Sequence, residues 1–190
     1  MRQLKFTFIF LLSALILSAC QVPSLQQTIV GSNQTVTEER PVAGIDAVEM
    51  HGFGRLVISQ GDEEALTIEA EDNLIPYLVT EMRGGTLVIR EKPLFSFKTD
   101  RPILFRLTVR ELSELKLNGF AQAEVNDLRV KTLKVRMNDF SQTTLDGLEA
   151  QSFEARISGF SHLAAAGVVD QAAVEMKESA EYLHGGLTIR

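Results

Sequence analysis

Three hexapeptides specify the fold: LKLNGF (residues 115–120), VRMNDF (135–140) and ARISGF (155–160). Each alternates apolar and polar side chains over three residues and continues with two turn residues, Asn-Gly, Asn-Asp or Ser-Gly, before a Phe, the pattern of a short strand that runs into a turn. Because the three stretches follow one another at an offset of 20 residues, the sequence contains an internal repeat.

A second turn recurs at the same offset in NDL (126–128), DGL (146–148) and AGV (166–168), and a fourth unit follows one residue short of the period. A unit of this size cannot bury its own apolar face and has to stack on its neighbours. The repeat predicts coils that pair about 4.8 Å apart. The predicted units are about 112–132, 133–152, 153–172 and 173–190.

The region before the repeat is strand-like but less regular. Alternating apolar residues at 45–50, 56–58, 66–69 and 87–89 are separated by glycine turns, and Asp72 or Asn73 is expected to cap a short helical turn over 72–78. We interpret this region as an irregular N-terminal β layer. The expectation is therefore an all-β, single-domain, right-handed parallel β-helix-like solenoid over residues 39–190, with coils of about 20 residues.

The first 19 residues have the charged-then-apolar order of a secretory signal. Their apolar run is shorter than the roughly 20 residues of a membrane-spanning helix. The run ends in Leu17-Ser18-Ala19-Cys20, which resembles the bacterial lipobox, and the chain has no other cysteine. We predict a lipoprotein signal peptide over 1–19 and lipid attachment at Cys20. The alternative is an ordinary signal cleaved after Ala19.

The segment 20–38 is polar, rich in Gln, Thr and Ser, and without clear periodicity, so we predict a lipid-anchored flexible tether. The expected location is the bacterial cell envelope, outside the cytoplasm. A Gln beside the lipidated cysteine, as at Gln21, generally permits export to the outer membrane where the host has one.

The repeats and several flanking motifs resemble the bacterial head GIN domain family, which is described as a putative autotransporter-adhesin head and is a domain of unknown function. The resemblance spans about residues 39–190 and implies a β-helix-like fold, an envelope location and no catalytic residues. It is carried by RPVAGI (40–45), HGFG (51–54), QGD (60–62), DNLIP (72–76), GGTLVI (84–89) and the Asn-Gly-Phe repeats.

The composition argues against several classes of function. Removal of the signal leaves 17 basic against 25 acidic side chains, a balance that argues against nucleic-acid binding. One cysteine excludes a multi-cysteine metal site, and His51, His162 and His184 lie on different units. We expect no metal, no cofactor and no catalytic residues.

Three columns of equivalent residues are candidates for binding or for stability. Lys116, Arg136 and Arg156 would form a ladder on the outer face of one strand, either an anion-binding site or a row of cross-strand ion pairs, and the second explanation is the simpler one. The polar and aromatic columns are expected to hold the coils together. Their members are Asn118, Asn138 and Ser158, and Phe120, Phe140 and Phe160.

The function expected from the sequence is a membrane-anchored, non-catalytic module for adhesion, for glycan or protein binding, or for envelope structure. The alternative is an envelope polysaccharide lyase or hydrolase, which rests on analogy with other β-helices alone. The expected partners are the membrane, a glycan or an envelope protein, and a second copy of the chain through the strand-like end at 187–189.

Overall fold

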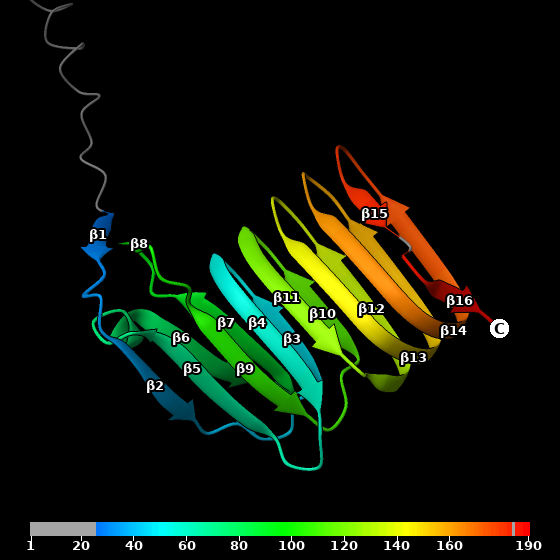
Figure 1. Cartoon of the computed structure of the whole chain (residues 1–190), viewed down its shortest axis with the longest axis horizontal. Helices are drawn as coiled ribbons and strands as arrows, with labels where there is room; N and C mark the ends of the chain where they lie inside the picture. Colours follow the sequence, from blue (N-terminus) through cyan, green and yellow to red (C-terminus); the bar gives the residue numbers. More distant parts are fainter. Residues whose placement is uncertain (1–25, 184) are drawn as a thin grey trace, which may run out of the picture.

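The computed structural model describes residues 26–183 and 185–190, and within them the chain is all-β, with one short 3-10 turn and no α-helix (Figure 1). One sheet of 14 strands forms the body, and β1 and β8 form a separate two-stranded sheet. The strands are β1 (Gln27–Val30), β2 (Thr35–Arg40), β3 (Ala47–Met50), β4 (Phe53–Gln60), β5 (Ala65–Glu71), β6 (Leu78–Arg83), β7 (Thr86–Glu91), β8 (Phe95–Lys98), β9 (Leu104–Val109), β10 (Glu114–Leu117), β11 (Phe120–Asn126), β12 (Arg129–Met137), β13 (Gln142–Ile157), β14 (His162–Met176), β15 (Glu181–Leu183) and β16 (Leu187–Ile189).

The C-terminal half, together with β3 and β4 as a first coil, is a stack of V-shaped coils that lie side by side (Figure 1). One arm of the stack is formed by β4, β11 and the first parts of β13 and β14. The other arm is formed by β3, β10, β12 and the later parts of β13 and β14. Neighbouring coils pair in parallel at the predicted offset, as Leu115 with Val135 and Val135 with Ala155.

Alternation along each strand creates the core between the two arms. In β12, Leu133, Val135 and Met137 are fully buried, whereas Lys134 and Arg136 point to solvent. Successive side chains of a strand point to opposite faces, so every second residue of each coil joins one continuous apolar core.

The shortened period begins earlier than the sequence alignment suggests. The alignment matches Gly147 with Gly167 and Leu148 with Val168, but the structure pairs Leu148 with Gly167 after an irregularity in the register. A Cβ atom on Gly167 would lie 2.0 Å from the Leu148 carbonyl oxygen. The missing residue is therefore absorbed where a glycine lets the two backbones approach closely.

Beyond the β3–β4 coil, the N-terminal half does not continue a purely parallel stack. Strand β9 pairs in parallel with β4 and β7 in parallel with β3, but β2 with β5, β5 with β9, and β6 with β7 are antiparallel. The sheet is mixed, so a parallel β-helix over the whole of 39–190 is not confirmed. Short connections such as the Gly84-Gly85 turn between β6 and β7 favour antiparallel neighbours.

Strand β1 and the first four residues of β2, which continues to Arg40, fall in the segment 20–38 that is predicted to be a flexible tether, so residues 27–30 and 35–38 are strand. The turn between them is held by the buried carboxylate of Glu71. Its Oε1 accepts a hydrogen bond from the Asn33 backbone N–H (2.6 Å), and its Oε2 accepts one from the Thr99 hydroxyl. Strand pairing and this buried acceptor order a sequence that lacks an apolar pattern of its own.

The short helix is present over Ile75–Tyr77, but its N-cap residue is Leu74 and no side chain caps it. Asp72 and Asn73 instead bond to the β1–β2 turn, where the Asn73 amide donates to the Val30 carbonyl (2.8 Å). None of the described helical turns is long and apolar enough to cross a membrane. The predicted signal, lipobox and Cys20 lie outside the described residues.

Candidate functional site

The turns between the two arms form a row along one edge of the stack (Figure 1). Each has one residue with a left-handed backbone at the same place: Gly52, Gly119, Asp139, Gly159 and Glu178. A Cβ atom on Gly159 would lie 2.5 Å from the Asp139 carbonyl oxygen, so the stacked turns are in close contact. This repeated geometry aligns the side chains on either side of the turn into columns.

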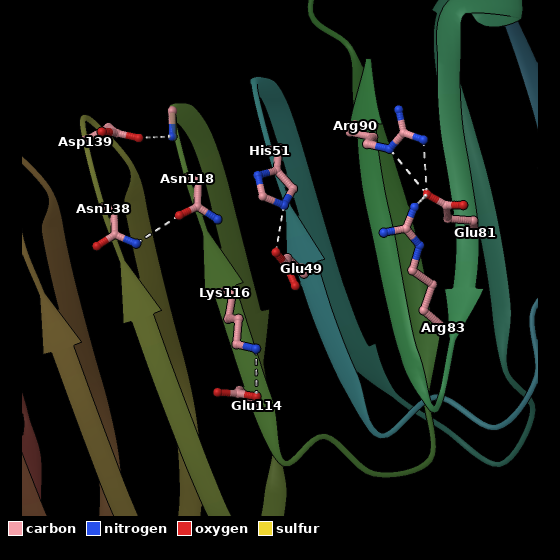
Figure 2. A network of polar contacts seen from close by, with 11 residues as sticks. Glu49, His51, Glu81, Arg83, Arg90, Glu114, Lys116, Asn118, Asn138 and Asp139 are labelled. Atoms are coloured by element: carbon pink, nitrogen blue, oxygen red, sulfur yellow. Dashed lines mark hydrogen bonds and ion pairs between the residues drawn. The ribbon is translucent and has the colours of Figure 1, made fainter. Parts of the chain in front are cut away.

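The residue before the left-handed position gives a polar column. The Asn138 side-chain amide donates to Asn118 Oδ1 (2.9 Å), and the Ser158 hydroxyl donates to Asn138 Oδ1 (2.6 Å); Figure 2 shows the first of these contacts. Figure 2 also shows Asp139, whose carboxylate accepts a hydrogen bond from the Gly119 N–H (3.0 Å). The polar groups of this column therefore bond along the stack.

The residue after the left-handed position gives an aromatic column. The rings of Phe120, Phe140 and Phe160 stack with centroids 5.0 and 5.3 Å apart and with planes 5° and 7° from parallel. The structure therefore brings the three rings together, but it places them at the surface, where the three side chains are 63%, 48% and 56% exposed. Phe140 stacks on both sides, and Phe120 and Phe160 each stack on one side. The stacked faces are turned toward another ring, so the stack presents mainly ring edges to solvent.

Further aromatic residues continue this edge toward the N-terminal layer. Phe53 is the strand partner of Phe120, its ring meets that of Phe97 at 5.7 Å, and Tyr77 meets Phe95 at 4.6 Å. Leu94, immediately before β8, is 61% exposed. We call the exposed residues Leu94, Phe120, Phe140 and Phe160 the aromatic edge.

The cationic ladder is ion-paired. Lys116 and Arg136 both contact the Glu114 carboxylate, at 3.2 and 3.0 Å, and Arg156 contacts Glu175 at 3.3 Å. A hydrogen bond from Lys177, together with the charges of Lys177 and Arg156, lowers the pKa of Glu175. The described residues thus contain the cross-strand ion pairs that the simpler explanation predicts, and a role in ligand binding stays a prediction.

A polar cleft of about 770 Å³ lies at the far ends of the strands, away from the row of turns. The Gln60 amide bridges its floor, donating to the Arg110 and Arg129 carbonyls (2.8 and 3.1 Å) and accepting from the Arg129 N–H (2.9 Å). The cleft is lined by Gln60, Gly61, Asp62, Arg110, Glu111, Asp127, Arg129, Gly147 and Glu149.

Several groups of the cleft are available to a ligand. Arg129 and Glu149 form an ion pair through two contacts of 3.1 Å. Within the part of the chain that the structure describes, Arg110 donates only through its Nε, to the Asp62 carbonyl at 2.7 Å. The carboxylates of Asp62, Glu111 and Asp127 form no hydrogen bond or ion pair with other described residues. The turn column of Asp127 and Gly147 is visible in the sequence, but no sequence signal indicates that Arg110, from a preceding loop, meets it.

His51 and His162 are apart in the fold, and His184 lies outside the described residues. His51 bonds to Glu49 at 2.7 Å, as Figure 2 shows, and His162 contacts Glu181 at 3.1 Å on another arm. Figure 2 also shows Glu81 between two arginines of the N-terminal layer, a paired cluster outside the cleft. Among residues 26–183 and 185–190, no group of three His, Cys, Asp or Glu side chains is placed to hold a metal ion.

The last coil has an open side. Strands β15 and β16 each pair with β14 alone, and Met176, Leu183 and Ile189 are exposed there. Self-association of the chain through this edge stays a prediction.

By its fold and surface the chain is an all-β protein of stacked strand–turn–strand coils, with an aromatic edge and, at the opposite ends of its strands, a polar cleft. The model of the family described as "Putative auto-transporter adhesin, head GIN domain" matches residues 45–190, so the chain belongs to that family, as its sequence motifs predict.

Solved structures share the fold at low identity. A putative adhesin from Bacteroides fragilis superposes with a TM-score of 0.76 at 17% identity, covering 84% of this chain and 74% of that one. A putative lipid binding protein from Parabacteroides distasonis gives 0.66 at 20% identity, covering 85% and 78%. A putative adhesin from the same species gives 0.62 at 18%, covering 85% and 77%. No curated protein matches the chain.

Proposed function

We propose that this protein is a non-catalytic, adhesin-like binding protein of the bacterial envelope, held at a membrane by a lipid on Cys20 and binding a glycan in the polar cleft. The stack of coils serves as a rigid support for that cleft. The family description and the names of two structural neighbours as adhesins support an adhesin-like role outside the cytoplasm.

The anchor is supported by the lipobox and by its position after a short apolar run. A lipid-modified cysteine carries more than one acyl chain, and two or more chains anchor a protein stably. The protein would then be retained at the membrane while its domain lies in the extracytoplasmic space.

Unpaired polar groups in the cleft are the observation that carries glycan binding. Free guanidinium N–H groups of Arg110 and the carboxylates of Asp62 and Asp127 supply donors and acceptors side by side, which is what hydroxyl-rich ligands require. The aromatic stack fits a sugar less well, because its ring faces are largely turned toward each other.

The test is binding of full-length protein in detergent to an array of bacterial and host polysaccharides. Arg110→Ala should weaken the strongest signal about tenfold or more, because a ligand group would lose a charge-assisted hydrogen bond. Arg106→Ala is the matched control, since Arg106 is an exposed arginine of β9 outside the cleft.

Equal binding by both variants and the wild type would remove the cleft from the proposal. Shortening of a bound polysaccharide, detected as new chain ends, would instead favour the enzymatic alternative, with the cleft carboxylates as its acidic groups.

A further inference from the structure

We infer that the aromatic edge docks onto the surface of the bilayer that holds the lipid anchor, so that the polar cleft faces away from the membrane. This inference rests on the lipid attachment at Cys20 in the proposed function. It adds an orientation and a second, apolar contact with the membrane.

The chain between the anchor and the domain is short. Strand β1 begins at Gln27, so only residues 21–26 separate it from Cys20. An extended chain covers at most about 3.6 Å per residue, which places the start of β1 within roughly 25 Å of the acylated cysteine. The domain is therefore held close to the membrane.

Strand β1 lies beside the aromatic edge. The Gln27 N–H donates to the Leu94 carbonyl at 2.7 Å, and β1 pairs with β8, whose Phe97 meets Phe53. Figure 1 shows β1 on the side of the molecule where the turns of the coils form their row. The chain thus enters the domain at the aromatic edge.

The aromatic edge has the chemistry of a membrane contact. The three stacked phenylalanines, with Leu94 beside β1, expose apolar surface of the kind that marks an interaction site. Phe and Leu are among the side chains by which interfacial segments bury apolar surface at the boundary between headgroups and acyl chains. Of the two acidic residues in the row of turns, Asp139 bonds to the Gly119 N–H, and Glu178 belongs to the last turn, beyond the stacked rings.

Charge indicates what kind of bilayer would be contacted. The mature chain carries an excess of acidic side chains. Near the turns, Lys116 and Arg136 are paired with Glu114, and Arg156 and Lys177 with Glu175, which leaves Lys92 and Lys98 near Leu94 as the exposed cations outside these pairs. Attraction to anionic lipids is therefore weak, and insertion should proceed on zwitterionic lipids with little dependence on salt.

The cleft then lies on the outer side. Strand β11 runs from Phe120 at the edge to Asn126 beside the cleft, a distance of about 20 Å at 3.3 Å per residue. The cleft would therefore open on the side of the protein that is farthest from the bilayer, where a ligand outside the membrane can enter it.

Because the chain contains no tryptophan, a single introduced indole reports on the edge directly. Full-length lipidated Phe140→Trp protein is reconstituted into phosphatidylcholine vesicles with and without brominated acyl chains. The indole should emit at shorter wavelength in vesicles than in buffer and lose about half or more of its emission to the bromines, since it would sit at the interface. Val36→Trp, an exposed position on β2 away from the edge, is the control and should be unaffected.

The outcomes separate docking from anchoring. Phe140→Trp protein that sediments with vesicles while its indole stays unquenched would overturn the docking inference and leave the anchor intact. Protein that fails to sediment with vesicles overturns both. An emission shift that follows protein concentration, without quenching by bromine, would overturn docking and assign the edge to a second copy of the chain. Phe160→Trp, at the end of the stack, repeats the test with only one ring contact changed.

Discussion

The two halves of the domain share one buried core but differ in how their strands pair. Residues 112–190 repeat one strand–turn–strand unit in parallel register, so each coil meets only its neighbours. Residues 27–109 pair partly antiparallel, and β9 and β5 contact strands distant in sequence. The repeated half is therefore specified locally, whereas the N-terminal layer depends on long-range pairing.

Substitution of a buried phenylalanine in each half should show this difference in strand pairing most strongly. Phe153 in β13 and Phe105 in β9 are both fully buried, so Phe153→Ala and Phe105→Ala should each lower the free energy of unfolding by about 3 to 5 kcal/mol. Hydrogen exchange should rise mainly in β12, β13 and β14 for the first variant and throughout the N-terminal layer for the second. Uniform exchange in both variants would abolish the distinction between the halves.

The next largest difference in stability is expected between two glycine substitutions, one in each half. Gly159→Ala should cost roughly 3 kcal/mol, because a positive φ of 75° adds to the 2.5 Å approach of the Asp139 carbonyl oxygen. Gly44 has a φ of 70° but nothing within 4 Å of a new Cβ, so Gly44→Ala should cost about 1 to 2 kcal/mol. Equal losses in chemical denaturation would show that close stacking of the turns adds nothing.

The aromatic side chains at the turns differ between the halves as well. Phe140→Ala removes two stacked ring contacts from a side chain that is half exposed, so we expect a loss of about 1 to 2 kcal/mol. Phe53→Ala should cost more, because Phe53 is half-buried against Phe97. A loss of about 3 kcal/mol or more for Phe140→Ala, measured by thermal unfolding, would indicate that its ring is buried in solution.

The charged ladder should contribute least. Arg136→Ala removes one ion pair of a half-exposed side chain with Glu114 and should change stability by less than about 1 kcal/mol, decreasing further with salt. A larger, salt-insensitive loss would mean that the ladder stabilises the coils more than an exposed ion pair can.

The repeated half could be predicted well from the sequence because its information is local. Alternation in residues 115–117, turn residues at 118–119 and the 20-residue offset together determine which strands pair and which side chains share a column. Motifs that extend beyond the repeat also indicated the family.

The remainder depends on pairing between distant residues. No periodicity indicates that β2 pairs antiparallel with β5, or that Glu71 accepts the Asn33 N–H and so orders the predicted tether. The sequence also does not predict that Phe120, Phe140 and Phe160 are exposed, because a Phe repeated after a turn is compatible with a buried column or a surface column. The polar cleft could not be predicted either, because it forms where Arg110 lies beside the turn residues Asp127 and Gly147 of other coils.

The membrane anchor of the proposed function and the docking of the aromatic edge both depend on the lipid at Cys20, so the decisive measurement compares wild type with Cys20→Ser by membrane fractionation and intact mass. Wild type should stay with membranes and carry the added mass of acyl chains, whereas Cys20→Ser should be released or left unprocessed. Unchanged mass together with unchanged membrane retention in Cys20→Ser would contradict the lipid anchor.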